Sequence, residues 1–244
     1  MYQRNKIGKM LKINDKFIID WTPKAGCTVV CKMIFEKLNI LNEALQYHHF
    51  IHRYRKAFYY NKYGRVTNKM LKNKKTIKIK FVRNPYDRAV SCYLHSCQNK
   101  LGGLSNYNNA NISFEFFLKL LLNQKNNKLT GNVHYNLQSL KIENKRKIFD
   151  KIIKLEKLNE EAKNLQKEYN LKLKTNFTSK HHRSTNLKNN YYYIGDLKFE
   201  EVIKQLSTYN NFYNEKTKKL VENFYGKDIE LYNYTFKEFM SKFE

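Results

Sequence analysis

An α/β fold, with a parallel sheet covered by helices on both faces, is the fold class that this sequence predicts. Three short runs of mostly β-branched and aliphatic residues, at about residues 16–21, 77–83 and 148–155, have the length and composition of strands. Segments with the apolar spacing of helices lie between these runs. Strands that alternate with helices favour parallel pairing, because each helical crossover returns the chain to the same edge of the sheet.

Helices are predicted from the spacing of apolar residues and from residues that begin helices well. Pro85 suits the first turn of a helix, and Ser113 can cap another. The expected helices cover about residues 28–40, 85–99, 158–169, 198–208 and 214–225. A further helix is expected after Ser113, with an apolar stripe of Phe116, Phe117, Leu120 and Leu121. Helical pieces are expected within the irregular basic segment 41–75, and loops at about residues 101–111, 123–140 and 172–190.

The length of the chain favours one ordinary domain. Of its 244 residues 41% are hydrophobic, and only 8 are glycine and 2 are proline. Such a chain can bury a sizeable core and leaves little room for long flexible linkers. We therefore expect a single domain over residues 1–244, with its core at about residues 16–235.

The net charge is strongly positive. The 47 basic and 21 acidic residues give a formal charge of +26, which attracts anions such as nucleic acids, acidic glycans and charged nucleotides. The abundance of Lys, Asn, Ile and Tyr also matches the residue bias of an AT-rich genome, in which case many lysines are simply solvated surface. Contacts with nucleic acid are therefore expected to be non-specific, and the oligomeric state stays open.

The sequence shows no sign of membrane insertion or export. No apolar run is long enough to span a membrane, and the basic segment 1–16 lacks the apolar core of a signal peptide. The four cysteines (Cys27, Cys31, Cys92 and Cys97) contain no C-x-x-C pair, so free buried thiols are expected and no metal site. These features favour a soluble cytoplasmic protein of a microbe or a virus-infected cell, whereas a Golgi location would require that an anchor was removed.

An anion-binding loop is predicted after the first strand. The loop Pro23-Lys24-Ala25-Gly26-Cys27-Thr28 leads from this strand into a predicted helix. Backbone N–H groups at a helix N-terminus and the helix dipole favour negative charge. Gly26 allows close approach of a ligand, Lys24 adds a full positive charge and Thr28 adds a hydroxyl. The loop therefore suits a phosphate-like or sulfate-like group.

A second polar motif follows the second predicted strand. Arg83 stands at the end of that strand, and Ser91 lies two turns into the helix that Pro85 begins. Ligands of parallel α/β sheets bind at the carboxyl ends of the strands, which is where Lys24 and Arg83 are expected. Both positions therefore belong to one candidate site.

The two motifs together resemble those of the carbohydrate-type sulfotransferases. The loop is similar to their 5′-phosphosulfate loop, and the second motif to R-[DN]-P-[FY]-x-R-x-x-S-x-Y, with Asn84 in place of the more frequent Asp. Weaker similarities follow in the same order at residues 132–138, 149–156, 181–185 and 221–234, so that the resemblance spans roughly residues 16–235. It implies a nucleotide-kinase-like, P-loop α/β fold and 3′-phosphoadenosine 5′-phosphosulfate as the donor.

The resemblance also implies roles for individual residues. Lys24 would bind the bridging and leaving oxygens, and the loop from Pro23 to Thr28 would cradle the 5′-phosphate through the backbone N–H groups of Ala25, Gly26, Cys27 and Thr28. Arg83 and Ser91 would hold the 3′-phosphate. Arg183 and Ser184 would add contacts from a late basic loop. Side chains and amides supply the positive charge, so no metal is required.

The acceptor hydroxyl needs a general base, for which histidine is suited near neutral pH. The candidates are His48, His49, His52, His95, His134, His181 and His182. His49 and then His48 are favoured, because related enzymes place a catalytic histidine between the two donor motifs, and His134 is the fallback. The acceptor, a glycan or another hydroxyl-bearing molecule that can be acidic, is expected to bind to Arg53, to Arg55 with the aromatic residues around them, and to His134.

Two other functions remain as alternatives. A nucleotide or small-molecule kinase would share the fold, but it requires a Gly-Lys-[Ser/Thr] order that this loop lacks. A non-catalytic, basic nucleic-acid-binding protein would explain the charge and the aromatic residues. Such a protein would bind with steep salt dependence and without preference for a 3′-phosphorylated nucleotide.

Overall fold

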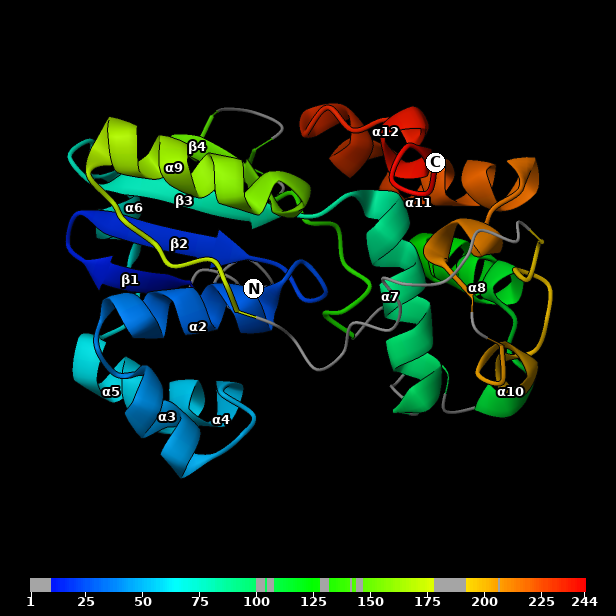
Figure 1. Ribbon diagram of the computed structural model, residues 1–244. Coiled ribbons are helices and arrows are strands. Elements are labelled where there is room, and N and C mark those ends of the chain that lie inside the picture. The colour runs from blue at the N-terminus through cyan, green and yellow to red at the C-terminus, as the bar shows by residue number, and fades with distance from the viewer. Residues whose placement is uncertain are drawn as a thin grey trace. The chain divides into compact units, whose positions relative to one another are not determined.

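A mixed four-stranded sheet organises the first of two compact units in the computed structural model (Figure 1). The strand order is β1-β2-β3-β4, with bounds Leu11–Asn14, Phe17–Trp21, Ile77–Val82 and Lys151–Lys154. β2, β3 and β4 are parallel, as the sequence predicts, and β1 pairs antiparallel with β2. The expectation of a wholly parallel sheet is therefore wrong at this one edge.

The two units divide the chain without following its order. The first contains Met1–Arg83 and Leu140–Lys180, and the second contains Asn84–Ser139 and His181–Glu244. The structure describes residues 10–99, 104, 108–127, 132–140, 142–143, 147–177, 192–205 and 207–244. Whether residues 1–244 behave as one domain stays a prediction.

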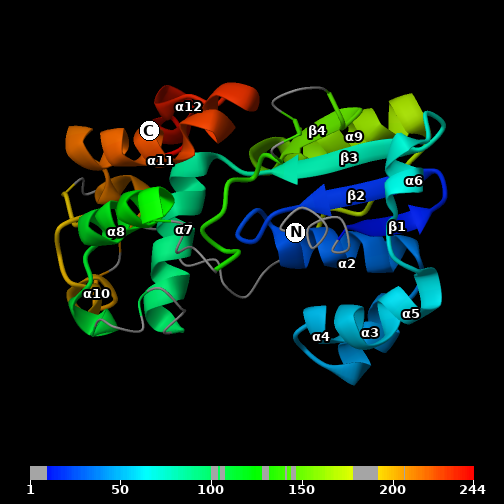
Figure 2. The same ribbon diagram turned by 180° about the vertical axis from the view of Figure 1, so that it is seen from behind.

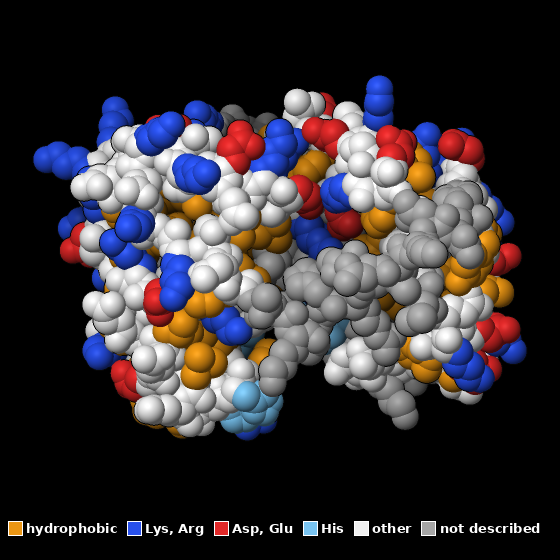
Figure 3. All heavy atoms as spheres, in the orientation of Figure 1, with side chains coloured by type: hydrophobic (Ala, Val, Ile, Leu, Met, Phe, Trp, Pro, Cys, Tyr) orange, Lys and Arg blue, Asp and Glu red, His pale blue; other side chains and the backbone are white. Residues whose placement is uncertain are grey.

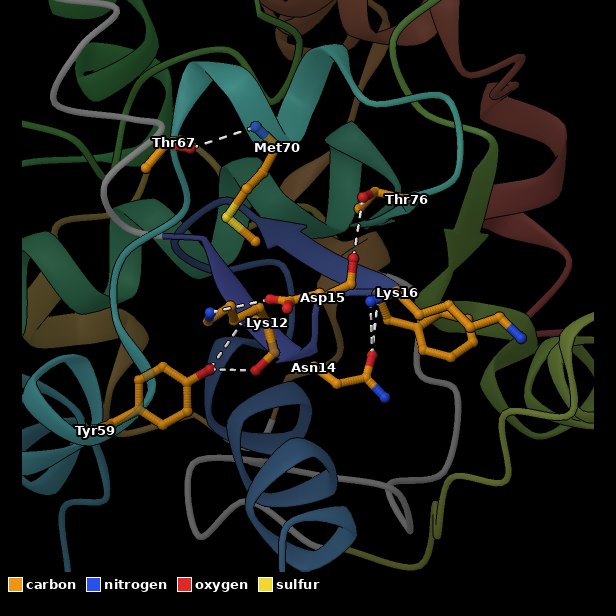
Figure 4. A network of polar contacts seen from close by, with 9 residues as sticks. Lys12, Asn14, Asp15, Lys16, Tyr59, Thr67, Met70 and Thr76 are labelled. Carbon is orange, nitrogen blue, oxygen red and sulfur yellow. Dashed lines mark hydrogen bonds and ion pairs between the residues drawn. The ribbon is translucent and has the colours of Figure 1, made fainter.

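The β1–β2 hairpin is held by polar side chains (Figure 4). The Asn14 side-chain oxygen accepts hydrogen bonds from the backbone N–H groups of Lys16 and Phe17, at 2.9 and 3.2 Å, which closes the turn. The Tyr59 hydroxyl accepts from the Lys12 N–H at 2.9 Å and donates to the Lys12 carbonyl oxygen. β1 was not predicted, because its short apolar alternation lies in a basic segment and one of its partners is 47 residues away.

Helices lie on both sides of the sheet (Figures 1 and 2), and residues of the strands contribute to a separate apolar cluster on each side. One layer contains α2 (Cys27–Lys37) and α9 (Leu158–Tyr169), which cover a core that includes Ile19, Phe81 and Ile153. The opposite face contributes Ile18 to a smaller cluster against Val66 and α6 (Asn68–Lys72). Helices thus cover both faces of the sheet, as predicted from the alternation of strands and helices.

Residues 41–75 are mostly helical, in short pieces. After α3 (Leu41–Tyr47), a continuous stretch contains α4 (His52–Tyr54), the π-helix η1 (Arg55–Tyr59) and α5 (Tyr60–Tyr63). Phe35 of α2 packs against the rings of Tyr54 and Tyr59, with ring centroids 5.6 and 5.5 Å away. The aromatic residues of this segment are therefore partly core, and not all of them form a binding surface.

The described part of the second unit is helical. Its longer helices are α7 (Pro85–Gln98), α8 (Phe114–Asn127) and α11 (Glu215–Leu231). The shorter elements are η2 (Asn109–Asn111), α10 (Phe199–Val202), η4 (Tyr209–Phe212) and α12 (Phe236–Met240), while η3 (Leu155–Lys157) belongs to the first unit. The helix predicted at about 198–208 is thus only the short α10, and α8 continues into the loop predicted from residue 123. The core of this unit is rich in aromatic rings, among them Tyr93, Phe114 and Tyr213.

Candidate functional site

The loop after β2 has a tight backbone conformation. β2 ends at Trp21, α2 begins at Cys27, and both Lys24 and Gly26 have a left-handed φ of 68°. The Ala25 N–H donates to the Thr22 carbonyl oxygen at 3.0 Å, which closes a turn within the loop. The Ala25 N–H is therefore not available to a ligand. Of the four backbone amides that are predicted to hold an anion, those of Gly26, Cys27 and Thr28 remain as candidates. The first amides of a helix have no intrahelical acceptor, so they suit this task.

Gly26 cannot be replaced without strain. A Cβ atom at this position would lie 2.6 Å from Cδ1 of Leu155, which follows β4, and the positive φ disfavours any L side chain. Gly26 also occupies the N-cap of α2 without a side-chain cap, and no acidic residue lies in the first turn. The positive end of the α2 dipole is therefore not offset by a carboxylate of its own helix.

Arg83 lies against the loop. β2 and β3 are neighbouring parallel strands, so their carboxyl ends lie side by side. One terminal nitrogen of the half-buried Arg83 guanidinium donates to the Lys24 carbonyl oxygen at 3.2 Å. The structure thus brings together Lys24 and Arg83, which the sequence predicts at one edge of the sheet. Their roles in binding a ligand remain predictions.

A buried cluster of charged side chains lies at β2 and β3, shortly before the ends of these strands. Lys80 of β3 has no exposed surface, and its ammonium lies 2.6 Å from a carboxylate oxygen of Glu143 and 3.6 Å from one of Asp20. Asp20 directly precedes Trp21, the last residue of β2. The cluster therefore braces both β2 and β3 directly before the residues that carry the candidate site.

Figure 3 shows histidine side chains gathered on the surface, over the region that α4 occupies in Figure 1. Of the two favoured histidines, His49 is exposed and His48 is half-buried. Their rings stack with centroids 4.2 Å apart. His48 Nδ1 accepts the Phe50 N–H at 2.8 Å, so the neutral ring carries its proton on Nε2. Partial desolvation, with nearby Arg53 and His49, lowers the pKa of His48. Because the lone pair of His48 is already used, His49 is the better placed of the two to accept a proton.

The acceptor-binding candidates Arg53 and Arg55 have different surroundings. Arg53 is exposed, whereas Arg55 is half-buried and lies over the Trp21 ring, with its guanidinium carbon 5.4 Å from the ring centroid. His52 is only 7% exposed, which distinguishes it from the surface residues His48 and His49. His52 is one of the seven histidines considered as a base from the sequence, but no local sequence pattern predicts that it is buried.

In the second unit, the site candidate Ser91 lies on α7, and the site candidate His134 lies beside this helix. Asn84 caps this helix by accepting the Tyr86 N–H at 3.0 Å, and Ser91 is buried at 9% exposure. The Asn132 side-chain oxygen accepts the His134 N–H at 3.0 Å and lies 2.7 Å from His134 Nδ1. An atom that accepts a backbone N–H is the amide oxygen, so His134 Nδ1 must carry a proton and Nε2 is the basic nitrogen.

Four of the predicted site residues, Arg183, Ser184, His181 and His182, lie outside the described residues.

All four cysteines are free, and burial raises the pKa of both Cys31 and Cys97 to about 12. In the described ranges, no group of three or more His, Cys, Asp or Glu side chains is arranged to hold a metal ion. No helix in these ranges is long and apolar enough to cross a membrane.

Comparison with known proteins identifies the class to which this fold and loop belong. The sequence model described as the Sulfotransferase family matches residues 10–235, which include β1 to β4 and the candidate site. The chain therefore belongs to the sulfotransferase family, with its P-loop-like α/β fold, and it is a transferase. No curated protein and no solved structure matches it.

Proposed function

We propose that the protein transfers a sulfuryl group from 3′-phosphoadenosine 5′-phosphosulfate to a hydroxyl group of a carbohydrate. Family membership supports sulfuryl transfer in general. The observation that carries the proposal is the hydrogen bond between Arg83 and the Lys24 carbonyl, since it joins the two motifs that resemble donor contacts. The acceptor hydroxyl oxygen forms a bond to sulfur, the bond from sulfur to the 5′-phosphate oxygen breaks, and the hydroxyl proton passes to a base.

Donor binding is proposed to rest on fixed positive charge. Lys24 would stabilise charge that develops on the leaving phosphate oxygen, while the amides from Gly26 to Thr28 hold the 5′-phosphate. Arg83 is proposed as a ligand of the 3′-phosphate, because a guanidinium can grip a phosphate with two hydrogen bonds. The resemblance proposes Ser91 for the same phosphate, and Arg183 and Ser184 for further contacts.

The acceptor is proposed to bind beside the segment 48–55. His49 is the proposed general base, with His134 as the alternative in the second unit, where its tautomer leaves Nε2 as the basic nitrogen. Rings and guanidinium groups of this segment suit a sugar that carries negative charge. The proposal requires no metal ligand.

Thermal stability with nucleotide ligands tests the donor site. A ligand that binds only the folded state raises the melting temperature. Adenosine 3′,5′-bisphosphate is expected to raise it, whereas AMP and ATP with Mg²⁺ raise it less. Lys24→Ala and Arg83→Ala should abolish the rise, and Lys69→Ala on the exposed side of α6 should retain it. An equal rise with ATP and Mg²⁺ would favour a kinase, and no rise with any nucleotide would favour a polyanion-binding protein.

A further inference from the structure

Two buried polar groups without partners lie close together in the first unit. Neither ring nitrogen of His52 has a hydrogen-bond partner, although the side chain is only 7% exposed. The Nε atom of Arg55 is also buried without a partner. Within the part of the chain that the structure describes, Arg55 forms no ion pair with a carboxylate, and its guanidinium carbon lies over the Trp21 ring.

His52 and Arg55 lie three residues apart in one continuous helical stretch, and the charge of Arg55 acts on the His52 ring. Burial, together with the positive charges of Arg55 and Lys56, lowers the pKa of His52 to about 3. Arg55 begins the π-helix η1 directly after α4, which ends two residues beyond His52. Trp21, under the Arg55 guanidinium, is the last residue of β2 before the candidate donor loop. π-Helical turns occur frequently at functional sites.

Unpartnered groups of this kind are costly unless a ligand completes them. A buried donor or acceptor without a partner, such as the Arg55 Nε or a ring nitrogen of His52, loses its hydration and gains no hydrogen bond in return. The Nε edge of a guanidinium matches the spacing of two oxygens in a carboxylate or sulfate. The neutral His52 ring can donate one further hydrogen bond to the same oxygens. One oxyanion would therefore satisfy both residues.

We propose that Arg55 and His52 form a subsite for an oxyanion, a carboxylate or sulfate group carried by the acceptor, next to the donor loop. That the oxyanion belongs to the acceptor rests on the proposed function, whereas the binding of an oxyanion by Arg55 and His52 does not. The acceptor is accordingly a molecule with a negative group beside its reacting hydroxyl. Arg55 and His52 act in this proposal by binding and positioning, and they do not take part in the transfer.

Titration of the protein with three small probes tests the subsite. The histidine ring signals are followed by NMR while glucuronate, inorganic sulfate or neutral glucose is added. We expect glucuronate to bind saturably and to raise the pKa of His52, since a nearby anion stabilises the imidazolium form. Glucose should have no effect. Arg55→Gln should weaken glucuronate binding at least tenfold, and Arg55→Lys should restore it only partly because lysine lacks the Nε edge.

Two matched variants separate binding from folding. Arg65→Gln removes another arginine that lies over an aromatic ring, that of Tyr60 at 4.4 Å, and should bind glucuronate normally. His52→Phe keeps the ring, should leave the melting temperature unchanged or higher, and should lose glucuronate binding. Both Arg55→Gln and His52→Phe should still be stabilised by adenosine 3′,5′-bisphosphate.

Each other result has a definite meaning. No response to any anion, or an equal response in Arg55→Gln, would overturn the subsite. Binding of inorganic sulfate without glucuronate would overturn the acceptor as the carrier, since the subsite would then take a free ion. Glucuronate binding through Arg55 without stabilisation by the bisphosphate would support the oxyanion subsite and contradict the proposed sulfotransferase reaction.

Discussion

The guanidinium of Arg83 donates a hydrogen bond to the backbone carbonyl oxygen of Lys24, with 3.2 Å between the two heavy atoms. These residues are 59 positions apart in the chain and follow the neighbouring parallel strands β3 and β2. The bond orients the Lys24 peptide, which precedes the left-handed Gly26 by only two residues. A substitution at Arg83 is therefore expected to change the loop as well as to remove a positive charge.

Replacement of Gly26 by Ala should damage the candidate donor site. The new Cβ would meet Leu155 at 2.6 Å, and the left-handed backbone alone costs an L residue roughly 1–2 kcal/mol. We expect a lower free energy of unfolding in urea and no stabilisation by adenosine 3′,5′-bisphosphate. Gly226→Ala is the matched control, because a Cβ there meets nothing within 4 Å and Ala in the interior of α11 should add roughly 0.5–1 kcal/mol. Equal effects of the two substitutions would contradict the steric argument.

Replacement of Lys80 by Met should destabilise the first unit strongly. The substitution leaves the carboxylates of Asp20 and Glu143 buried without their cation, and breaking a buried pair on one side costs about 3–5 kcal/mol. Urea unfolding of the variant measures this loss. Lys69→Met, at an exposed position of α6, should change stability by less than about 0.5 kcal/mol. A small effect at Lys80 would mean that the cluster does not brace the sheet.

Stability should fall as the pH is lowered from neutral, in part because of His52. Its pKa is about 3 in the folded chain and 6.5 as the ordinary value, so below pH 6.5 the unfolded chain binds a proton that the folded chain does not. This difference removes about 1.6 kcal/mol of stability between pH 6.5 and pH 5. The contribution is present above pH 6.5 and is lost as the pH falls toward 3.

The same measurement on His52→Phe supplies the control. Without an ionisable group at this position, its free energy of unfolding should decline less between pH 6.5 and pH 5. Removal of two unpartnered nitrogens should also raise its stability at pH 7 by roughly 1 kcal/mol. Parallel pH profiles of the two proteins would show that His52 is not buried in its neutral form.

Substitution of the candidate bases should separate His49 from His48. Loss of a general base typically lowers kcat by 10²–10⁴-fold, and His49→Ala is expected to do so. His48→Ala should have a smaller effect, because His48 Nδ1 already accepts the Phe50 N–H. The measurement is the rate of sulfate transfer at saturating donor, with bisphosphate stabilisation as a check on folding. A large loss in His134→Ala alone would instead assign the base to the second unit.

Much of the fold was predictable because it depends on neighbours in the chain. Apolar runs marked β2, β3 and β4, and Pro85 marked the start of α7. The candidate loop was recognisable for the same reason, since its Lys24 and Gly26 lie within a few residues of a strand and a helix. The sequence by itself therefore determined the order of β2, β3 and β4 with the helices that follow them, and the position of the candidate loop.

Other features depend on partners far away in the chain, which no local pattern reveals. β1 is held by Tyr59, and Asp228 accepts the backbone N–H groups of Gln138 and Ser139 from about 90 residues away. Residues 132–140, predicted only as a loop, are therefore anchored at one end by a buried carboxylate. The absence, in the described part of the chain, of hydrogen-bond partners at the His52 ring nitrogens and the Arg55 Nε likewise depends on how the surrounding helices and strands pack. Only the tertiary structure decided these points, because burial and pairing are set by the elements that meet in space.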